Sequence, residues 1–423
     1  MRKLGLALAM MLLAVLWVQA QPEKVTLTFN YFADPSMEAN VPLVAEFERR
    51  YPHIKVLHRT LPANVDMMHD KYVTSLASGD SSMDVFALDI IWPAEFANAR
   101  WLLPLDNLVT PAKRATFIPS TLPPVTWKGK LYALPWNCNV GTFFYRLDLL
   151  EQAGLPPPGN WNQVVESSMA LRERYPDLLR EPLVMQAGRY EGLVCDFLEL
   201  LWGNGAEVFD ANGKVVINSP QAVESLQYFC DLIGRWKLTP RAVTSYKEDD
   251  SYVAFSQGKA LYHRSWPYVV KTGIEPTSKI YKKVGFTRIP GKNGPAHGCL
   301  GTWNLAISAG TRHPREAYLL LDFLTSPYAE KTHALESGLN PSLSALYRDP
   351  DLLAQRPYLP EFLTLIETGK PRPVTPLYPK VSRILQIQVH RALTGELTPQ
   401  QALDEAAWKL EELRRRYPGV PLT

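Results

Sequence analysis

Short clusters of aromatic and polar side chains recur along this chain of 423 residues. Tryptophan stands close to a carboxylate, an amide, a glycine or another ring in residues 89–92, 135–139, 265–268 and 301–303, and a fifth cluster occupies residues 32–38. Carboxylates, amides and arginine bind groups that donate and accept hydrogen bonds, whereas rigid indole rings cover apolar surface. A sugar offers both surfaces, because its hydroxyls are polar and its ring C–H faces are apolar. The clusters therefore predict a carbohydrate site.

A structural role is the alternative for each of these residues taken alone. A buried tryptophan belongs more often to a core than to a ligand site, and Glu38 could stabilise the N-terminus of the helix that follows it. We assign five of the tryptophans outside the clusters to packing; they are Trp101, Trp127, Trp202, Trp236 and Trp408. The prediction of a site depends on the joint arrangement of the clusters.

The sequence lacks the local motifs of several enzyme classes. It contains no GxSxG elbow, no HExxH pair and no phosphate-binding loop, since Asn293 follows Lys292 where serine or threonine is required. The eight histidines are scattered without metal-ligand spacing. We therefore predict no catalytic residue, no metal and no cofactor. A glycosidase stays an alternative, because it needs only two positioned carboxylates and the chain has 42 aspartates and glutamates.

The elements that must position the clusters follow an α/β pattern. Residues 25–31 alternate between apolar and polar, residues 43–51 carry apolar side chains at helical spacing, and residues 54–58 and 84–91 are typical of further strands. This alternation of strands and helices predicts a largely parallel sheet. Ligands bind such sheets outside the carboxyl ends of the strands, where the first two clusters along the chain lie. The Lys128-Gly129 pair further predicts a tight hairpin turn.

The first 20 residues have the composition of an export signal. Arg2 and Lys3 precede an apolar run over residues 4–18, and Ala20 completes a small-residue cleavage site. The run is shorter than the roughly 20 apolar residues of a membrane span, and no cysteine follows the cleavage point to carry a lipid. We therefore predict a cleaved signal peptide and a periplasmic or otherwise extracytoplasmic protein.

The size and charge of the remaining chain restrict its class. Removal of 20 of the 423 residues leaves 403, which is too long for one core and fits two lobes. The formal charge of +3 falls to +1 when Arg2 and Lys3 are lost, so we expect no nucleic-acid partner. The four cysteines form no CxxC pair; they are Cys138, Cys195, Cys230 and Cys299. The sequence leaves open whether they form disulfides or remain buried thiols.

The order of several segments carries a family resemblance. They include DVFALDIIWP at 84–93, KGKLYALP at 128–135, FYRLDLL at 144–150 and RPVTPLYP at 372–379, together with residues 32–38, 190–193, 208–213, 265–268 and 301–303. In this order they resemble the extracellular solute-binding proteins of family 1, and within it the trehalose/maltose (α-glucoside)-binding branch of ABC sugar importers. The resemblance covers essentially the whole mature chain.

The resemblance implies an α/β protein with the two-lobed periplasmic-binding-protein (Venus flytrap) fold of type II, with several hinge crossings and the sugar between the lobes. Residues 21–134 and 304–338 would form the N-terminal lobe, and residues 135–303 and 339–423 the C-terminal lobe. The implied function is capture of an α-glucosidic disaccharide, such as trehalose, maltose or a sucrose-like sugar, by a monomer that is no enzyme. Hinge closure then presents the sugar to the ABC permease subunits in the membrane.

The resemblance also implies binding residues on the first lobe and at its edge. By match to the motifs of the family, Glu38 and Asp89 bind sugar hydroxyls, and Arg59 joins them after the second strand. Asn137 and Asn139 stand where the branch carries an aromatic residue and then an aspartate. An asparagine still donates and accepts hydrogen bonds, but it has no charge.

Aromatic residues and an arginine complete the implied site. Trp266, Trp303 and Tyr268 would stack on the sugar or enclose it. The backbone of Gly301 would approach the sugar closely, as a residue without Cβ can, and Arg372 would donate a fork of hydrogen bonds from the second lobe.

Two rival functions stay open. The first is a secreted glycoside hydrolase or lyase, which would add two catalytic carboxylates to the same aromatic residues. The second is a binding protein for another solute, such as an oligosaccharide or a glycerol phosphate. A phosphate ligand would need more basic side chains than the clusters contain.

Overall fold

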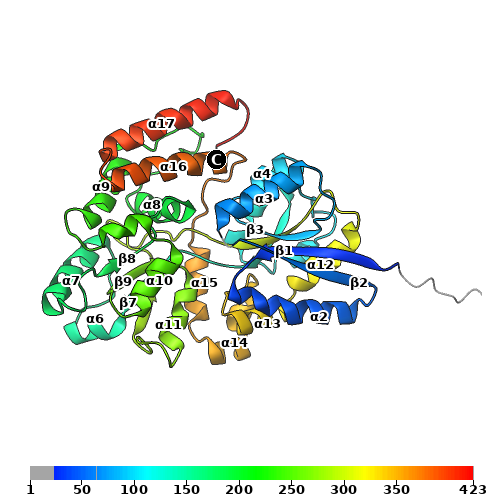
Figure 1. The fold of residues 1–423 in the computed structure, drawn as a ribbon, viewed down its shortest axis with the longest axis horizontal. Coiled ribbons are helices and arrows are strands. Elements are labelled where there is room, and N and C mark those ends of the chain that lie inside the picture. Colours follow the sequence, from blue (N-terminus) through cyan, green and yellow to red (C-terminus); the bar gives the residue numbers. More distant parts are fainter. Residues whose placement is uncertain (1–22, 63, 423) are drawn as a thin grey trace, which may run out of the picture.

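The computed structural model describes residues 23–62 and 64–422. The predicted signal peptide, residues 1–20, therefore lies outside the described residues. The chain folds into two α/β lobes, each built around its own sheet (Figure 1). No helix among the described residues has the length and hydropathy needed to span a bilayer.

The first lobe is built around a mixed sheet. In the described residues its strands follow the order β2 (Ile54–Leu61), β1 (Val25–Phe32), β3 (Val85–Asp89), β11 (Trp303–Ile307) and β6 (Ala133–Asn137). Strands β2, β1 and β3 are parallel, whereas β11 is antiparallel to both β3 and β6. All five residues of β3 are buried because helices cover both faces of the sheet (Figure 1). The predicted order of strand, helix, strand, helix, strand is confirmed by β1 to β3.

The helices of the first lobe come from both the beginning and the later part of the chain. Those before β6 are η1 (Pro35–Ala39), α2 (Asn40–Arg50), α3 (Val65–Ala77), α4 (Pro93–Asn98), α5 (Pro111–Arg114), η2 (Pro119–Thr121) and η3 (Pro123–Val125). Those after β11 are α12 (Pro314–Leu324), α13 (Pro327–Ser337), η6 (Ser344–Arg348), α14 (Pro350–Gln355) and α15 (Leu359–Glu367). A small hairpin of β4 (Thr126–Trp127) and β5 (Lys130–Leu131) turns at Lys128 and Gly129, both with positive φ, as predicted.

The second lobe has a smaller sheet between two helical layers. In the described chain its strand order is β10 (Val284–Thr287), β7 (Thr142–Arg146), β9 (Tyr262–Ser265) and β8 (Leu183–Val184). Its helices are α6 (Leu147–Ala153), α7 (Trp161–Arg174), α8 (Glu191–Gly203), α9 (Pro220–Ile233), η4 (Arg241–Ser245), α10 (Glu248–Ser256), η5 (Pro267–Val269), α11 (Val270–Ile274), α16 (Tyr378–Leu393) and α17 (Pro399–Arg416). Figure 1 shows α16 and α17 beside α8 and α9, so the C-terminal helices complete this lobe.

Within the described residues the chain passes between the lobes at three crossings, which we define as residues 138–141, 298–302 and 368–374. The crossings are hydrogen-bonded to one another. The N–H of Gly301 donates to the carbonyl of Asn139 (2.8 Å), and the N–H of Leu300 donates to the carbonyl of Lys370 (3.0 Å). The second crossing therefore lies between the first and the third.

The crossings differ from the lobe boundaries that the sequence suggests. Residues 135–137 and Trp303 belong to strands of the first sheet and not to the second lobe. The segment around Ser342 packs on the first lobe, where its carbonyl accepts from the N–H of Ile118 (3.0 Å). Helix α15 contacts both lobes, because Phe362 stacks on Phe286 of β10 with ring centroids 4.4 Å apart. Such contacts join distant segments and leave no local pattern in the sequence.

The four cysteines, Cys138, Cys195, Cys230 and Cys299, are free thiols in the described residues. Of the two alternatives left open by the sequence, the structure has the thiol form. Cys138, Cys195 and Cys299 are fully buried and pack as small apolar side chains.

Glu330 of α13 is buried beside the first crossing, and its contacts indicate that its carboxyl group is protonated. Its Oε2 accepts from the backbone N–H groups of Ser342 (2.6 Å) and Leu343 (3.1 Å). The Ser342 hydroxyl lies 2.9 Å from the carbonyl oxygen of Pro135 and also contacts Glu330 Oε1. A serine hydroxyl carries one proton, so both contacts are hydrogen bonds only if Glu330 is protonated. Burial, the largest effect, raises the pKa of Glu330 to about 8.

We expect Glu330 to make the free energy of unfolding fall as the pH rises from about 4.5 to about 8. The folded state keeps a proton on Glu330 that the unfolded chain releases, so this stabilisation is complete below the unfolded pKa and is lost toward the folded pKa. Each pH unit over which the states differ by one proton changes stability by about 1.4 kcal/mol. Glu330→Gln keeps a donor and an acceptor but does not titrate. Denaturant unfolding should give similar stabilities at about pH 5 and a more stable variant at about pH 8; parallel pH profiles would contradict this assignment.

Candidate ligand-binding site

Three of the predicted residues form a row across the edge of the first sheet. Asp89 is the last residue of β3, Trp303 is the first residue of β11, and Asn137 is the last residue of β6. Trp303 is paired with Asp89 on one side and with Asn137 on the other. The row faces the crossings, because β6 leads into the first and β11 follows the second.

Arg372 of the third crossing connects this row to the second lobe. Its Nη2 lies 3.2 Å from Asp89 Oδ1 and donates to the carbonyl of Leu300 (3.3 Å), while its Nη1 donates to Glu191 Oε1 (2.7 Å). Asp89, Glu191 and Arg372 are 6%, 4% and 4% exposed. A guanidinium therefore lies between two carboxylates, one from each lobe, in a poorly hydrated setting that strengthens the interactions.

Burial next to another carboxylate changes the acidity of Asp89. The pKa of Asp89 is raised to about 6, chiefly by desolvation; the charge of Arg372 opposes this increase and the charge of Glu191 adds to it. Asp89 is thus a carboxylate that accepts hydrogen bonds above this pH and carries a proton below it. A sugar hydroxyl can donate to it in the first form.

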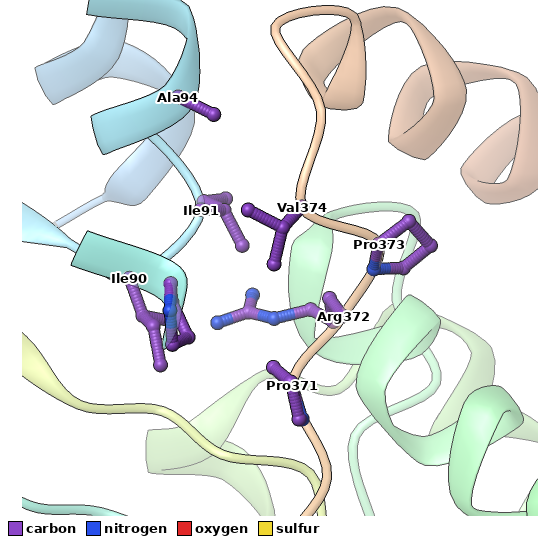
Figure 2. A pocket seen from close by; sticks show the side chains of 8 residues that line it. Ile90, Ile91, Ala94, Pro371, Arg372, Pro373 and Val374 are labelled. Atoms are coloured by element: carbon purple, nitrogen blue, oxygen red, sulfur yellow. The ribbon is translucent and has the colours of Figure 1, made fainter. Parts of the chain in front are cut away.

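Figure 2 shows the Arg372 side chain extending from the third crossing toward Ile90 and Ile91. These residues line a small cavity together with Ala94, Pro124, Pro371, Pro373 and Val374. Its volume of about 10 Å³ leaves room for about one water molecule. This cavity is far too small for a sugar.

Two tryptophans reach the crossings from opposite lobes. Trp303 packs on Phe32 with ring centroids 4.4 Å apart and meets Trp92 edge-on at 5.9 Å. Trp266, at the end of β9, contacts Gly301 of the second crossing so closely that a Cβ there would lie 2.7 Å from Trp266 Cζ3. Both indoles are only partly buried, which leaves ring surface for a ligand.

We expect Gly301→Ala to lower the free energy of unfolding by about 1–3 kcal/mol, since the added methyl forces the Trp266 indole to move. Gly294→Ala is the matched control, because an added Cβ there meets nothing within 4 Å. Denaturant unfolding and tryptophan fluorescence check both variants. Equal stability and equal emission in the two variants would show that Gly301 does not hold the indole in place.

The other predicted residues differ in how near they lie to this row. Asn139 donates to Asn137 Oδ1 (3.4 Å) and is part of the first crossing. Tyr268 follows Trp266 by two residues and packs on Tyr252 with ring centroids 5.6 Å apart. Both residues are partly buried, and their binding roles stay predictions.

Glu38 and Arg59 are not brought into contact with the row. Glu38 is exposed on η1, a few residues after Phe32. Arg59 is exposed on β2, the edge strand of the first sheet, and β1 separates β2 from β3. Asp80 has a lowered pKa, chiefly because of the Ser75 hydroxyl, and the charge of Arg59 contributes to that shift. The binding roles of Glu38 and Arg59 stay predictions.

Sequence reasoning missed two carboxylates that face the same region. Glu191 begins α8, where the segment 190–193 belongs to the family pattern but no role was assigned to it. Asp66 lies in the first turn of α3, and its side chain is exposed. Desolvation by the surrounding protein nevertheless raises the pKa of Asp66. The charge of Glu191 adds to this increase, and the charge of Arg383 opposes it. Asp66 therefore faces charged groups of the second lobe.

The described residues place no group of three or more His, Cys, Asp or Glu side chains where they could hold a metal ion. The site is therefore described by its carboxylates, its arginine, its amides and its indoles.

Comparisons with known proteins identify the family and the fold of this chain. Residues 34–331 match the model of the bacterial extracellular solute-binding protein family. A probable ABC transporter-binding protein of Deinococcus radiodurans is 31% identical over 364 residues, 84% of this chain and 86% of the relative. The maltose-bound structure of T. maritima MalE3 is 36% identical over 92% of this chain and 100% of its own, with a TM-score of 0.86. A solute-binding protein of Agrobacterium vitis S4 with bound D-mannitol is 25% identical over 94% of this chain and 100% of its own, with a TM-score of 0.80.

These similarities confirm the predicted two-lobed α/β fold, since they extend over nearly the whole of each solved chain. Membership of this family implies two classes of partner, a small-molecule ligand and an ABC permease. The family match covers well over half of the chain, and the chain therefore belongs to the bacterial extracellular solute-binding proteins.

Proposed function

We propose that this protein captures an α-glucosidic disaccharide between its lobes and delivers it to the permease of an ABC importer. The observation that carries the proposal is the row of Asp89, Trp303 and Asn137 facing Arg372 and Trp266 across the crossings. It combines charged hydrogen-bonding groups with two partly exposed indoles, which is the chemistry that a disaccharide requires. The similarity to maltose-bound T. maritima MalE3 supports an α-glucoside as the ligand.

Each group has a distinct task in this proposal. Asp89 accepts from sugar hydroxyls, and Arg372 donates to them. Trp303 and Trp266 cover the apolar faces of the rings. The backbone of Gly301, which carries no Cβ, approaches the sugar closely in this proposal.

Closure of the lobes would couple binding to recognition by the permease. The sugar contacts both halves of the site only when the lobes are close, so it stabilises the closed state by its higher affinity for that state. The hydrogen-bonded crossings are the segments about which such a motion can occur. We expect affinity on the order of micromolar, roughly −8 kcal/mol, which a few charge-assisted hydrogen bonds and stacked rings can supply.

The same proposal includes the setting in which the protein acts. We propose an extracytoplasmic monomer that binds the sugar without cleaving it, with Glu38, Asn139 and Tyr268 as further ligand contacts. Incubation with maltose or trehalose should leave both sugars intact; free glucose would instead support the glycoside hydrolase alternative.

A thermal-shift screen tests the choice of ligand. The panel contains maltose, trehalose, sucrose, D-mannitol, an arabino-oligosaccharide and a glycerol phosphate. A ligand that binds only the folded state adds about 2.7 kcal/mol to the free energy of unfolding at about 100 times its Kd. The melting temperature rises as a result. We expect the α-glucosidic disaccharides to give the largest shifts, and a panel in which they give none would contradict the proposal.

A linear polyol is the second candidate, because the relative from Agrobacterium vitis S4 contains D-mannitol and is 25% identical. A polyol has no ring face, so it gains less from the two indoles than a disaccharide does. A larger shift with D-mannitol than with maltose would favour this candidate.

A further inference from the structure

A buried charged cluster lies beneath Trp266 in the second lobe. Arg264 of β9 forms a two-pronged ion pair with Glu199 of α8, with Nη2 and Nε 2.5 and 2.6 Å from the two carboxylate oxygens. Arg264 Nη1 lies 2.8 Å from Asp196 Oδ1 and donates to Gln186 (3.1 Å). Arg264, Asp196 and Glu199 are each about 1% exposed. The geometry compensates the high cost of burying charge, and each partner depends on the others.

The arginine of this cluster supports the Trp266 indole. The guanidinium carbon of Arg264 lies 4.5 Å from the centroid of the Trp266 ring, within the range of a cation–π interaction. Gly301 of the second crossing contacts the same ring. Trp266 is thus held by a group whose own position is set by Glu199 and Asp196.

The glutamate of the cluster holds two crossings. Glu199 Oε1 accepts from the N–H of Cys299 in the second crossing (2.8 Å). At Gly141 in the first crossing, a Cβ would lie 1.7 Å from the same oxygen, so the backbone passes directly over the carboxylate. Glu199 is therefore hydrogen-bonded to the second crossing and lies directly against the backbone of the first.

We propose that Arg264 and Glu199 are positioning residues for ligand capture, which set the Trp266 indole and the crossings in the geometry that the ligand needs. The inference rests on the proposed function for its effect on affinity. Neither residue touches the ligand in this account: Arg264 acts through Trp266, and Glu199 acts through Arg264 and the crossings. The cluster thereby links the Trp266 indole to the crossings, which bend when the lobes close.

Arg264→Lys tests the proposal, with Arg146→Lys as its matched control. Arg146 is also buried in the second lobe, where it pairs with Asp148 through two hydrogen bonds (2.7 and 2.6 Å) and donates to the carbonyl of Gly258 (3.1 Å). Lysine keeps the charge but loses the planar fork. We expect both variants to lose stability. Only Arg264→Lys should weaken maltose binding, by about tenfold. The same variant should change the tryptophan signal in near-ultraviolet circular dichroism.

A spectroscopic comparison separates positioning from general destabilisation. The change caused by Arg264→Lys should vanish when Trp266→Phe is already present, because the signal that it alters comes from that indole. Glu199→Gln, which keeps an acceptor for Cys299 but loses the charge, should weaken maltose binding by a few-fold and alter the same signal. This second variant reports on the cluster even if Arg264→Lys does not fold.

The outcomes distinguish this inference from the proposed function. Unchanged affinity in both cluster variants, an equal loss in Arg146→Lys, or a spectral change that persists without Trp266 would each overturn it. If the wild-type protein binds none of the sugars, the proposed function fails, whereas the spectral comparison still decides whether Arg264 and Glu199 hold Trp266.

Discussion

Arg372→Met is expected to lower the free energy of unfolding by about 3–5 kcal/mol and to weaken sugar binding on the order of 100-fold. Methionine retains the aliphatic part of the side chain, but it leaves Asp89 and Glu191 buried without their shared cation. The loss is large because the two carboxylates are poorly hydrated and belong to different lobes. Denaturant unfolding and calorimetric titration measure the two effects.

Arg383→Met is the control for this variant. Arg383 lies on α16 close enough to lower the pKa of Asp66 in part, but its side chain is exposed, and we expect a change within about 0.5 kcal/mol. Adding Glu191→Gln to Arg372→Met should restore part of the lost stability, since it removes one uncompensated charge. A loss below about 1 kcal/mol in Arg372→Met, or no recovery in the double variant, would show that the interlobe ion pair is not a major interaction.

Replacing either Trp303 or Trp266 with alanine is expected to weaken sugar binding by about 30-fold or more, which corresponds to about 2 kcal/mol. Each change removes the ring on one side of the sugar while leaving the polar groups of the other lobe. Because both indoles are only partly buried, the fold should persist, as far-ultraviolet circular dichroism will show.

Trp408→Ala provides the matched control for the tryptophan variants. Trp408 is 56% exposed on α17, within the second lobe and outside the site. Its replacement should leave sugar affinity within twofold of the wild type, which is a change of at most about 0.4 kcal/mol in the free energy of binding. Equal affinities in the wild type, Trp266→Ala and Trp303→Ala would remove both indoles from the site.

Features with a local cause were predictable from the sequence. The alternation and apolar runs of β1, β2 and β3 are properties of strands in a covered sheet, and the Lys128-Gly129 turn follows from backbone conformations that glycine tolerates. Asp89 could be placed at a carboxyl end of the sheet for the same reason. The first two clusters along the chain, residues 32–38 and 89–92, were thus assigned to the correct ends of strands.

Features that depend on distant segments were not predictable from local patterns. The insertion of β11 between β3 and β6 brings Trp303 next to Asp89, and no periodicity specifies that strand order. Arg372 and Glu191 are 181 residues apart in the chain, and Arg264 and Glu199 are 65 apart. Arg59 illustrates the reverse case: it lies on a strand that was correctly predicted, but that strand is at the edge of the sheet.

The most direct test of the central claim is calorimetric titration of the purified wild-type protein with maltose, followed by chromatography of the recovered sugar. We expect one sugar bound per chain, a Kd on the order of micromolar, and maltose recovered unchanged. Absence of binding by maltose and every other α-glucosidic disaccharide, or recovery of glucose, would contradict it.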